Sequence, residues 1–151
     1  VGEMRDLETV SIAVTAAEMG ILVMGTLHTN GFGQTFDRIV NSFPTDKQPH
    51  VRTMLSTSLR GVISQQLVAR KGEPGLVAAL EIMVNTPAVS NLIRQGKLDQ
   101  LENAIQGGSK IGMRTMDSAL KDLMDQGRIT GKTAYESALE KRKFEDVKEL
   151  A

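Results

Sequence analysis

The first 28 residues constrain the fold most, because a helical pattern there is bracketed by two strand signals. Apolar residues recur at helical spacing from Leu7 to Ala17, and Gly20 is placed to end that helix. The apolar run from Ile21 to Leu27 then predicts a buried strand with His28 at its carboxyl end. The acidic segment before the helix has the pattern of a strand exit, so Glu3 is expected at the same sheet edge as His28. An α/β fold is predicted, with its chemistry at that edge.

The rest of the first half predicts two more helices and a β-hairpin. The helical patterns cover residues 34–42 and 50–60, separated at Pro44 and Pro49, and the β-rich runs are Val62 to Val68 and Leu76 to Val84. A turn rich in glycine, with one proline, joins the two β-rich runs. We therefore expect these runs to pair as an antiparallel hairpin.

The second half predicts short helices marked by capping signals. Thr86 is a good N-cap with Pro87 at the first helical position, and Gly96 can end that helix. Further helices are expected over residues 97–105, from Thr115 to Gly127, and from either Thr130 or Thr133 to Leu139, the second alternative with Glu136 as a capping box. The charged tail, residues 140–151, is expected to be a solvated helix or frayed. The prediction is thus a sheet-containing part, residues 1–85, followed by a carboxyl-terminal helical bundle, residues 86–151.

Composition excludes several classes of function. Eighteen basic and eighteen acidic residues cancel, and no basic block offers a footprint for nucleic acid. The chain has no cysteine, which rules out disulfides and cysteine-bound zinc, and no metal-ligand set is predicted. No apolar run approaches the roughly 18 residues of a membrane span.

Two glycine-rich segments imitate a phosphate-binding loop. Gly127 to Thr133 ends in Gly-Lys-Thr, but only three residues separate its glycines where four are needed, and a helix precedes it in place of a strand. Gly107 to Lys110 lacks the upstream glycine at the required spacing. Neither segment is expected to hold phosphates.

The candidate catalytic residues have plain structural alternatives. A carboxylate at Glu3 can orient water or hold Mg²⁺ beside a phosphate, or it can belong to a solvated charge cluster. His28 can act on a phosphate, or it can be a structural histidine. Arg5 can reach a nucleotide, a neighbouring subunit or Asp6, while Glu8 is expected to compensate the dipole of the first helix. From the residues alone, these alternatives stay open.

A series of short motifs in fixed order narrows the choice. It runs Gly2 to Thr9, Gly25 to Thr29, Asp37 to Val40 with Phe43-Pro44, Val51 to Ser56, Val62 to Leu67, Ala79 to Met83, Thr86 to Ala88, Asn91 to Arg94 and Gly112 to Asp117. Together these segments resemble the retraction ATPases of type IV pili, which belong to the secretion ATPase superfamily. The first two look like the Walker B region and the histidine box of that family. Each match is short, but their number and order make the resemblance specific.

The resemblance implies a function that this segment would share with residues before Val1. It implies the carboxyl-terminal part of a RecA-like, homohexameric ATPase in the cytoplasm, which docks on the platform protein at the inner-membrane base of the pilus machine. ATP and Mg²⁺ would be held mainly by an upstream segment with the phosphate-binding loop, so the chain alone is expected to be inactive. Glu3 would be the catalytic base and His28 would sense the γ-phosphate, while Arg5 is a weaker candidate for nucleotide contact.

Two departures from related families bear on the type of motor. The assembly and general secretion relatives carry a four-cysteine zinc module after the segment matching Val62 to Val68, where this chain has a short turn without cysteine. The retraction family's Ala-Ile-Arg-Asn-Leu-Ile-Arg-Glu signature reads Ala-Val-Ser-Asn-Leu-Ile-Arg-Gln over residues 88–95. We expect Leu92 and Ile93 to pack inward, and Asn91 and Arg94 to couple nucleotide state to movement. Alternatives are an accessory paralogue, a related secretion ATPase, or an assembly or docking module without hydrolysis.

Overall fold

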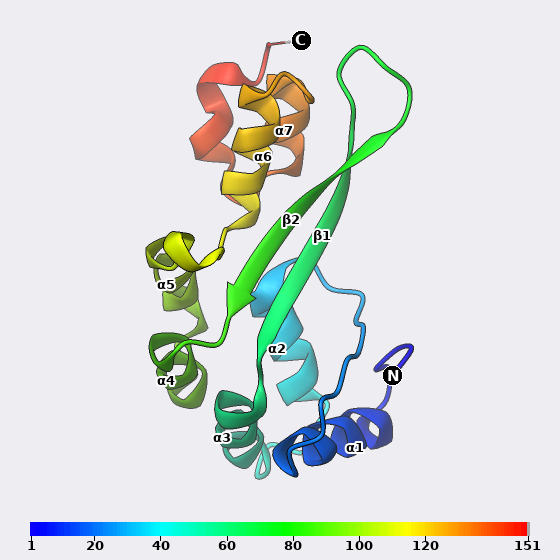
Figure 1. Ribbon diagram of the computed structural model, residues 1–151, viewed down its shortest axis with the longest axis vertical. Helices are drawn as coiled ribbons and strands as arrows, with labels where there is room; N and C mark the ends of the chain where they lie inside the picture. The colour runs from blue at the N-terminus through cyan, green and yellow to red at the C-terminus, as the bar shows by residue number, and fades with distance from the viewer. Residues whose placement is uncertain (151) are drawn as a thin grey trace.

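A long antiparallel hairpin organises the structure, a computed structural model in which residues 1–150 are described (Figure 1). Strand β1 covers Gly61–Ala69 and β2 covers Leu76–Val84, with Gly61 opposite Val84 and Ala69 opposite Leu76. The predicted hairpin is therefore confirmed. One group of helices surrounds its open end and another lies beside its turn end.

The first helical group builds a core with the open end of the hairpin. Its elements are α1 (Leu7–Glu18), α2 (Gly31–Asn41), α3 (Gln48–Ser58), α4 (Pro87–Gln95), the 3₁₀ turn η1 (Leu98–Gln100) and α5 (Leu101–Gly107). Their buried side chains include Val10, Phe36, Leu55 and Ile93, which form one cluster with Met83 of β2. Burial of these apolar faces stabilises helices that are too short to persist alone.

The second helical group packs on the other half of the hairpin. It consists of the 3₁₀ turn η2 (Ser109–Ile111), α6 (Met116–Asp125), α7 (Gly131–Ser137) and the 3₁₀ helix η3 (Lys141–Val147). Leu120, Ile129 and Phe144 form a second cluster with Val77 and Ala79 of β2. The hairpin thus contributes to both cores. The predicted boundary between residues 1–85 and 86–151 stays a prediction.

Most of the capping signals are confirmed. Thr86, Thr115 and Thr130 each accept a hydrogen bond from a backbone N–H in the first turn of the following helix. Gly96 and Gly127 lie in the left-handed region after their helices, with φ of 70° and 68°. This backbone conformation is one that side chains other than glycine rarely adopt.

Three details of the prediction are wrong. Pro49 lies in the first turn of α3, where its missing N–H costs nothing, and does not separate that helix from the one before it. Thr130, the first of the two predicted starts, caps α7, but α7 ends at Ser137 and not at Leu139. The tail is not simply solvated, because Phe144 of η3 is buried in the second core. Ala151 lies outside the described residues.

The buried strand predicted over residues 21–27 is also wrong. The segment is extended but is not assigned as a strand, and Leu22 and Met24 are 78% and 77% exposed. A buried parallel strand needs neighbours on both edges and helices on both faces. In the part of the chain that the structure describes, this segment makes hydrogen bonds to residues 1–4 along one side. The apolar pattern is therefore present without the surroundings that a buried strand requires.

Candidate active site

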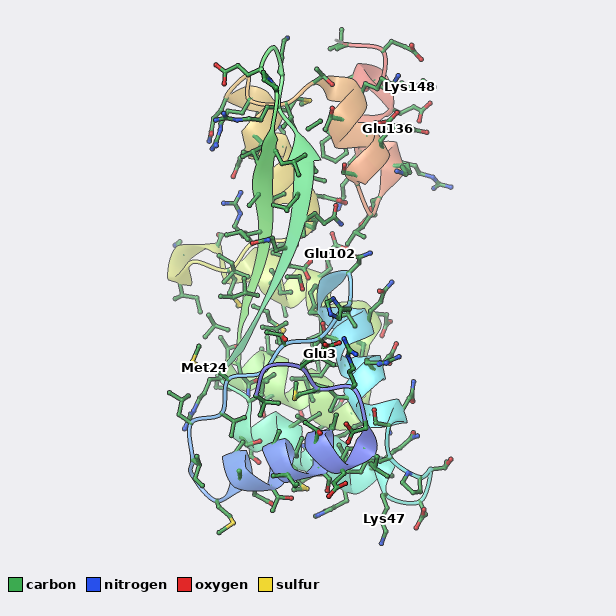
Figure 2. All side chains as sticks on the ribbon, turned by 90° about the vertical axis from the view of Figure 1, so that its right-hand side faces the viewer. Glu3, Met24, Lys47, Glu102, Glu136 and Lys148 are labelled. Carbon is green, nitrogen blue, oxygen red and sulfur yellow. The ribbon has the colours of Figure 1, made fainter. Side chains whose placement is uncertain are left out.

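Two extended segments bring Glu3 and His28 together. Val1 donates to the Met24 carbonyl at 2.8 Å and the Met4 amide donates to Thr26 at 2.9 Å, so the segments run in the same direction. His28 Nε2 lies 3.2 Å from Glu3 Oε1, so the two side chains meet, although neither follows a strand of a sheet as predicted. Figure 2 shows Glu3 near the middle of the molecule, far from Lys148 at its carboxyl-terminal end. The Glu3 side chain is 27% exposed and that of His28 is 84% exposed, which leaves the imidazole accessible.

Arg5 holds the carboxylate of Glu3. Its Nε lies 2.5 Å from Glu3 Oε1, and this hydrogen bond, together with the charges of Arg5 and His28, keeps the pKa of Glu3 below its usual range. Glu3 is therefore ionised at neutral pH. Asp6, the other partner considered for Arg5, instead caps α1 by accepting from the Thr9 amide at 2.8 Å.

The segment after His28 is fixed by the start of α2. Thr29 Oγ1 lies 2.8 Å from Thr35 Oγ1, and the Thr35 hydroxyl donates to the Gly31 carbonyl at 2.9 Å. Gly31 turns the chain into the helix with φ of 86°. The position of His28 therefore depends on the position of the first turn of α2.

An open cavity of about 480 Å³ adjoins His28. It is lined by His28, Thr29, Gln34, Asp37, Arg38, Asn41 and Ser42. Gln34, Arg38 and Asn41 recur at helical spacing on α2, on the face away from its buried Phe36, Ile39 and Val40. Sequence reasoning missed this polar stripe, although its spacing directly after a histidine was available as a signal.

The four residues predicted to couple nucleotide state to movement lie on α4, which packs against α3 and α5. Ile93 is buried and Leu92 is half-buried against the first core, as expected from the sequence. Asn91 Oδ1 accepts from Arg94 Nη2 at 2.8 Å, so these two exposed side chains contact each other. None of the four lines the cavity beside His28.

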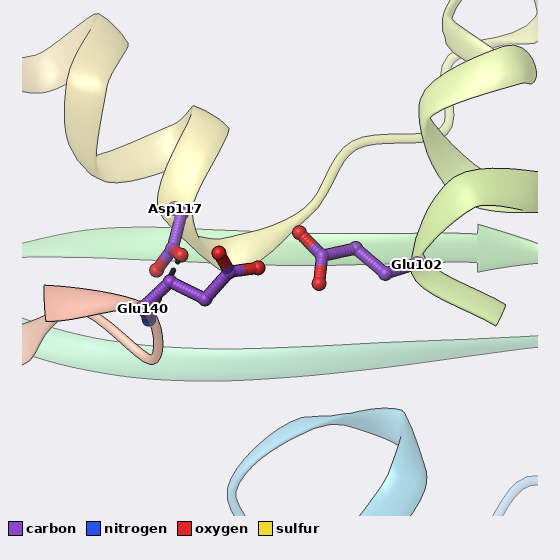
Figure 3. Close-up of side chains that lie close together, drawn as sticks. All are labelled: Glu102, Asp117 and Glu140. Carbon is purple, nitrogen blue, oxygen red and sulfur yellow. Dashed lines mark hydrogen bonds between the residues drawn. The ribbon is translucent and has the colours of Figure 1, made fainter. Parts of the chain in front are cut away.

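Three carboxylates from different elements meet elsewhere in the molecule (Figure 3). One oxygen each of Glu102, Asp117 and Glu140 lies within 4.8 Å of the others. Lys143 Nζ lies 2.7 Å from Glu102, 2.9 Å from Glu140 and 3.7 Å from Asp117. Because the Lys143 ammonium group already contacts all three carboxylates, we interpret the cluster as an ion-pair network that joins α5, α6 and η3.

The two glycine-rich segments are helical turns, as expected. Gly127 to Thr133 joins α6 to α7, and the Thr130 hydroxyl caps α7. Gly107 and Gly108 close α5 and lead into η2. Neither has the preceding strand that a phosphate-binding loop needs.

Comparison with known proteins identifies the family. The family model described as type II/IV secretion system protein matches residues 1–75. The chain is 53% identical over 138 residues to the type IV pilus retraction ATPase PilT of Pseudomonas aeruginosa, an alignment that covers 91% of this chain and 40% of the relative. This chain belongs to the PilT-like secretion ATPases. It is also 50% identical over 138 residues to a twitching motility protein of Neisseria gonorrhoeae, covering 91% of this chain and 37% of that protein.

A solved structure extends the similarity to the fold. The crystal structure of the pilus retraction motor PilT with bound ADP matches with a TM-score of 0.86 and 44% identity, over 97% of this chain and 40% of that chain. The predicted α/β fold, part of a RecA-like ATPase, is thereby confirmed. The chain spans about 40% of the length of these relatives. Among the described helices, none is both long and apolar enough to cross a membrane.

Proposed function

We propose that this chain forms the carboxyl-terminal portion of a longer ATPase that powers type IV pilus retraction and twitching motility. The observation that carries the proposal is the pairing of Glu3 with His28, at 3.2 Å, in a chain similar to PilT over most of its length. The ADP bound to the solved PilT motor supports a nucleotide as the ligand. The phosphate-binding loop would lie upstream of Val1 in the longer protein.

Glu3 and His28 would act on the attacking water and the γ-phosphate. The ionised carboxylate of Glu3 can accept a hydrogen bond from the water and orient it toward phosphorus. Because the pKa of Glu3 is lowered, orientation is a stronger part of this role than proton abstraction. The His28 imidazole can donate to a γ-phosphate oxygen or to a water beside it, which would make the His28 segment sensitive to the bound nucleotide.

The residues present fit one end of the substrate. Glu3 and His28 offer groups for a water and a terminal phosphate, and Thr29 and Arg38 line the adjoining cavity. A backbone nest for the remaining phosphates would come from the upstream segment, together with most of the contacts to Mg²⁺. When bound, Mg²⁺ supplies neutralisation of charge on the phosphates. Arg5 would give up its ion pair with Glu3, or keep it while the same carboxylate also accepts from the water. Contact of Arg5 with the nucleotide is a secondary proposal.

The proposed assembly follows from the family resemblance. The longer protein would form a homohexamer in the cytoplasm and dock on the platform protein at the inner-membrane base of the pilus machine. On α4, Asn91 and Arg94 would present the polar face that couples nucleotide state to movement, while Leu92 and Ile93 anchor the helix.

An accessory paralogue of the retraction motor is the second proposal, and one observation favours it. At the position of the signature's first arginine, Ser90 donates to the Ser56 carbonyl at 2.6 Å. This position thus joins α4 to α3 and offers no charge to a partner. Pilus retraction by the longer protein in the absence of other retraction ATPases would refute the accessory role.

The experiment that tests the proposed hydrolysis is Glu3→Gln in the longer protein. The amide keeps the size of the side chain but loses its charge, so ATP should still bind while turnover falls about 10²–10⁴-fold. Steady-state hydrolysis and equilibrium nucleotide binding are measured on both proteins, with the exposed Glu8→Gln as the control. Turnover by Glu3→Gln close to that of the wild type would remove Glu3 from the catalytic role.

A further inference from the structure

Glu81 is a buried carboxylate that the proposed chemistry does not use. It lies on β2, opposite Ser64 in the strand register, and is only 1% exposed. Its neighbours on the same face of the strand are Ala79, in the second core, and Met83, in the first. Glu81 therefore lies at the junction of the two cores.

The two oxygens of Glu81 cap two different helices. Oε1 accepts from the Phe32 amide at 2.8 Å, in the first turn of α2, and Oε2 accepts from the Met116 amide at 3.3 Å, in the first turn of α6. The N-cap of α2, Asn30, makes no side-chain capping bond. A strand residue thus supplies to α2 the capping that its own sequence lacks.

The two helix starts offset part of the cost of burying the charge of Glu81. The charged side chains that bear on it are both acidic: Glu102 of α5 and Asp117 of α6. Burial raises the pKa of Glu81, and the amides of Phe32 and Met116 act in the opposite direction. Moving either helix start away would leave a buried carboxylate with half of its hydrogen bonds, which is costly in a medium of low dielectric constant.

The two helix starts that Glu81 caps make further contacts. On one side, the first turn of α2 fixes Thr29 and hence His28, through Thr35 and Gly31. On the other side, Asp117 in the first turn of α6 accepts from the amides of Leu139 at 2.8 Å and Glu140 at 3.0 Å. In addition, Ile82 and Arg114 exchange backbone hydrogen bonds of 2.9 Å, which hold β2 to the segment before α6.

We propose that Glu81 is a positioning residue for the Glu3–His28 site, and that it makes the starts of α2 and α6 move together. This inference rests on the proposed function, since the site it positions is the proposed hydrolytic one. Through Glu81, a displacement of the His28 segment by a nucleotide reaches the carboxyl-terminal helices. Glu81 itself touches neither nucleotide nor water.

The test compares Glu81→Gln with Asp117→Asn in the longer protein. A glutamine can accept from one of the two amides, but its NH₂ group faces the other amide as a second donor. Asp117→Asn alters another buried carboxylate that accepts two backbone amides, but not one that contacts α2. Both variants exchange a buried carboxylate for an amide. Asp117 also lies 3.7 Å from Lys143 Nζ, whereas only Glu81 contacts the start of α2.

Amide hydrogen exchange and kcat together distinguish a role of Glu81 in positioning the site from a role in stability alone. In nucleotide-free protein, Glu81→Gln should speed amide hydrogen exchange in both residues 29–35 and residues 114–120, whereas Asp117→Asn should leave residues 29–35 unchanged. Glu81→Gln should also lower kcat by about 10- to 100-fold with KM for ATP within about twofold, because small misplacements of catalytic groups act on the transition state. Asp117→Asn should leave kcat close to that of the wild type.

Several results would overturn the proposal. Unchanged exchange at residues 29–35 in Glu81→Gln would mean that Glu81 does not hold α2. Altered exchange with unchanged kcat would reduce it to a structural residue. If Glu81→Gln does not fold, Glu81→Asp replaces it, since the shorter side chain keeps the charge but cannot span both amides, and the same results are required. If the wild type neither binds nor hydrolyses ATP, the proposed function fails, and the exchange readout still decides whether Glu81 joins the two helices.

Discussion

At the scale of single residues, the site depends on how Glu3 is shared. Arg5 at 2.5 Å and His28 at 3.2 Å both address Oε1 of the same carboxylate. The Arg5 contact keeps Glu3 charged, and it also competes with the water that Glu3 would orient. A nucleotide that draws Arg5 away would free the carboxylate at the moment of use.

Replacing Arg5 should change the pH dependence of hydrolysis. The hydrogen bond from Arg5 is the main cause of the lowered pKa of Glu3, so Arg5→Gln should return that pKa toward its ordinary value. In its proposed role Glu3 acts as a carboxylate, and in Arg5→Gln its charged form would be lost at a higher pH as the pH falls. The acid limb of kcat in the longer protein should therefore move to higher pH. Arg52→Gln, on α3, is the control, and an acid limb that stays in place would show that Arg5 does not tune Glu3.

At the scale of elements, local signals predicted the capped starts of three helices. Thr86, Thr115 and Thr130 were recognisable because each caps its own helix within three residues. The capping of α2 by Glu81 was not, because 49 residues separate the carboxylate from the Phe32 amide. Glutamate in a β-rich run carries no sequence signal for such a role. Contacts of this kind become visible only when the topology is known.

The candidate site was predictable to a similar degree. Glu3 and His28 meet, but the strands on which that prediction rested are not present among the described residues. The contact between Arg5 and Glu3 was not predicted, because several acidic partners lie close in sequence. Residues 21–27 show the limit of prediction from sequence patterns. Apolar residues such as Leu22 indicate that a segment needs to be buried, but they do not identify the segment that would cover it.

Variants of α4 separate coupling from packing. Asn91→Ala and Arg94→Ala remove an exposed polar pair, so they should impair surface motility more than stability or basal ATP hydrolysis. Ile93→Ala removes a fully buried side chain and should lower the free energy of unfolding by about 2–5 kcal/mol. Melting temperature, ATPase rate and motility are measured on all three. Normal motility in both polar variants would refute a coupling role for this face.

At the scale of the whole molecule, two apolar cores share one hairpin. Met83 belongs to one core and Val77 and Ala79 to the other, with Glu81 between them. The ion-pair network of Glu102, Asp117, Glu140 and Lys143 makes a second link between the two groups of helices. Polar contacts between the two cores hold the two groups of helices in a fixed relative position, although each group keeps its own core.

Glu81 should give the stability of the chain a measurable pH dependence. Burial raises its pKa in the folded state above the unfolded value, so the folded state binds more protons between those two values. The contribution of Glu81 to the free energy of unfolding is therefore fully present below the unfolded pKa and is lost as the pH rises through the folded pKa. Urea unfolding at a series of pH values should show this slope in the wild type and in Glu8→Gln, but not in Glu81→Gln. Equal slopes in all three proteins would contradict the raised pKa.

The central claim is that this chain supplies Glu3 and His28 while the phosphate cradle lies in a preceding segment. The most direct measurement is Mg²⁺-dependent ATP turnover by residues 1–151 and by the longer protein in one assay. The account predicts turnover by the longer protein and none measurable by residues 1–151, because the part of the chain that the structure describes offers no backbone nest for the phosphates beside the two side chains. Turnover by residues 1–151 alone, or its absence in the longer protein, would contradict the account.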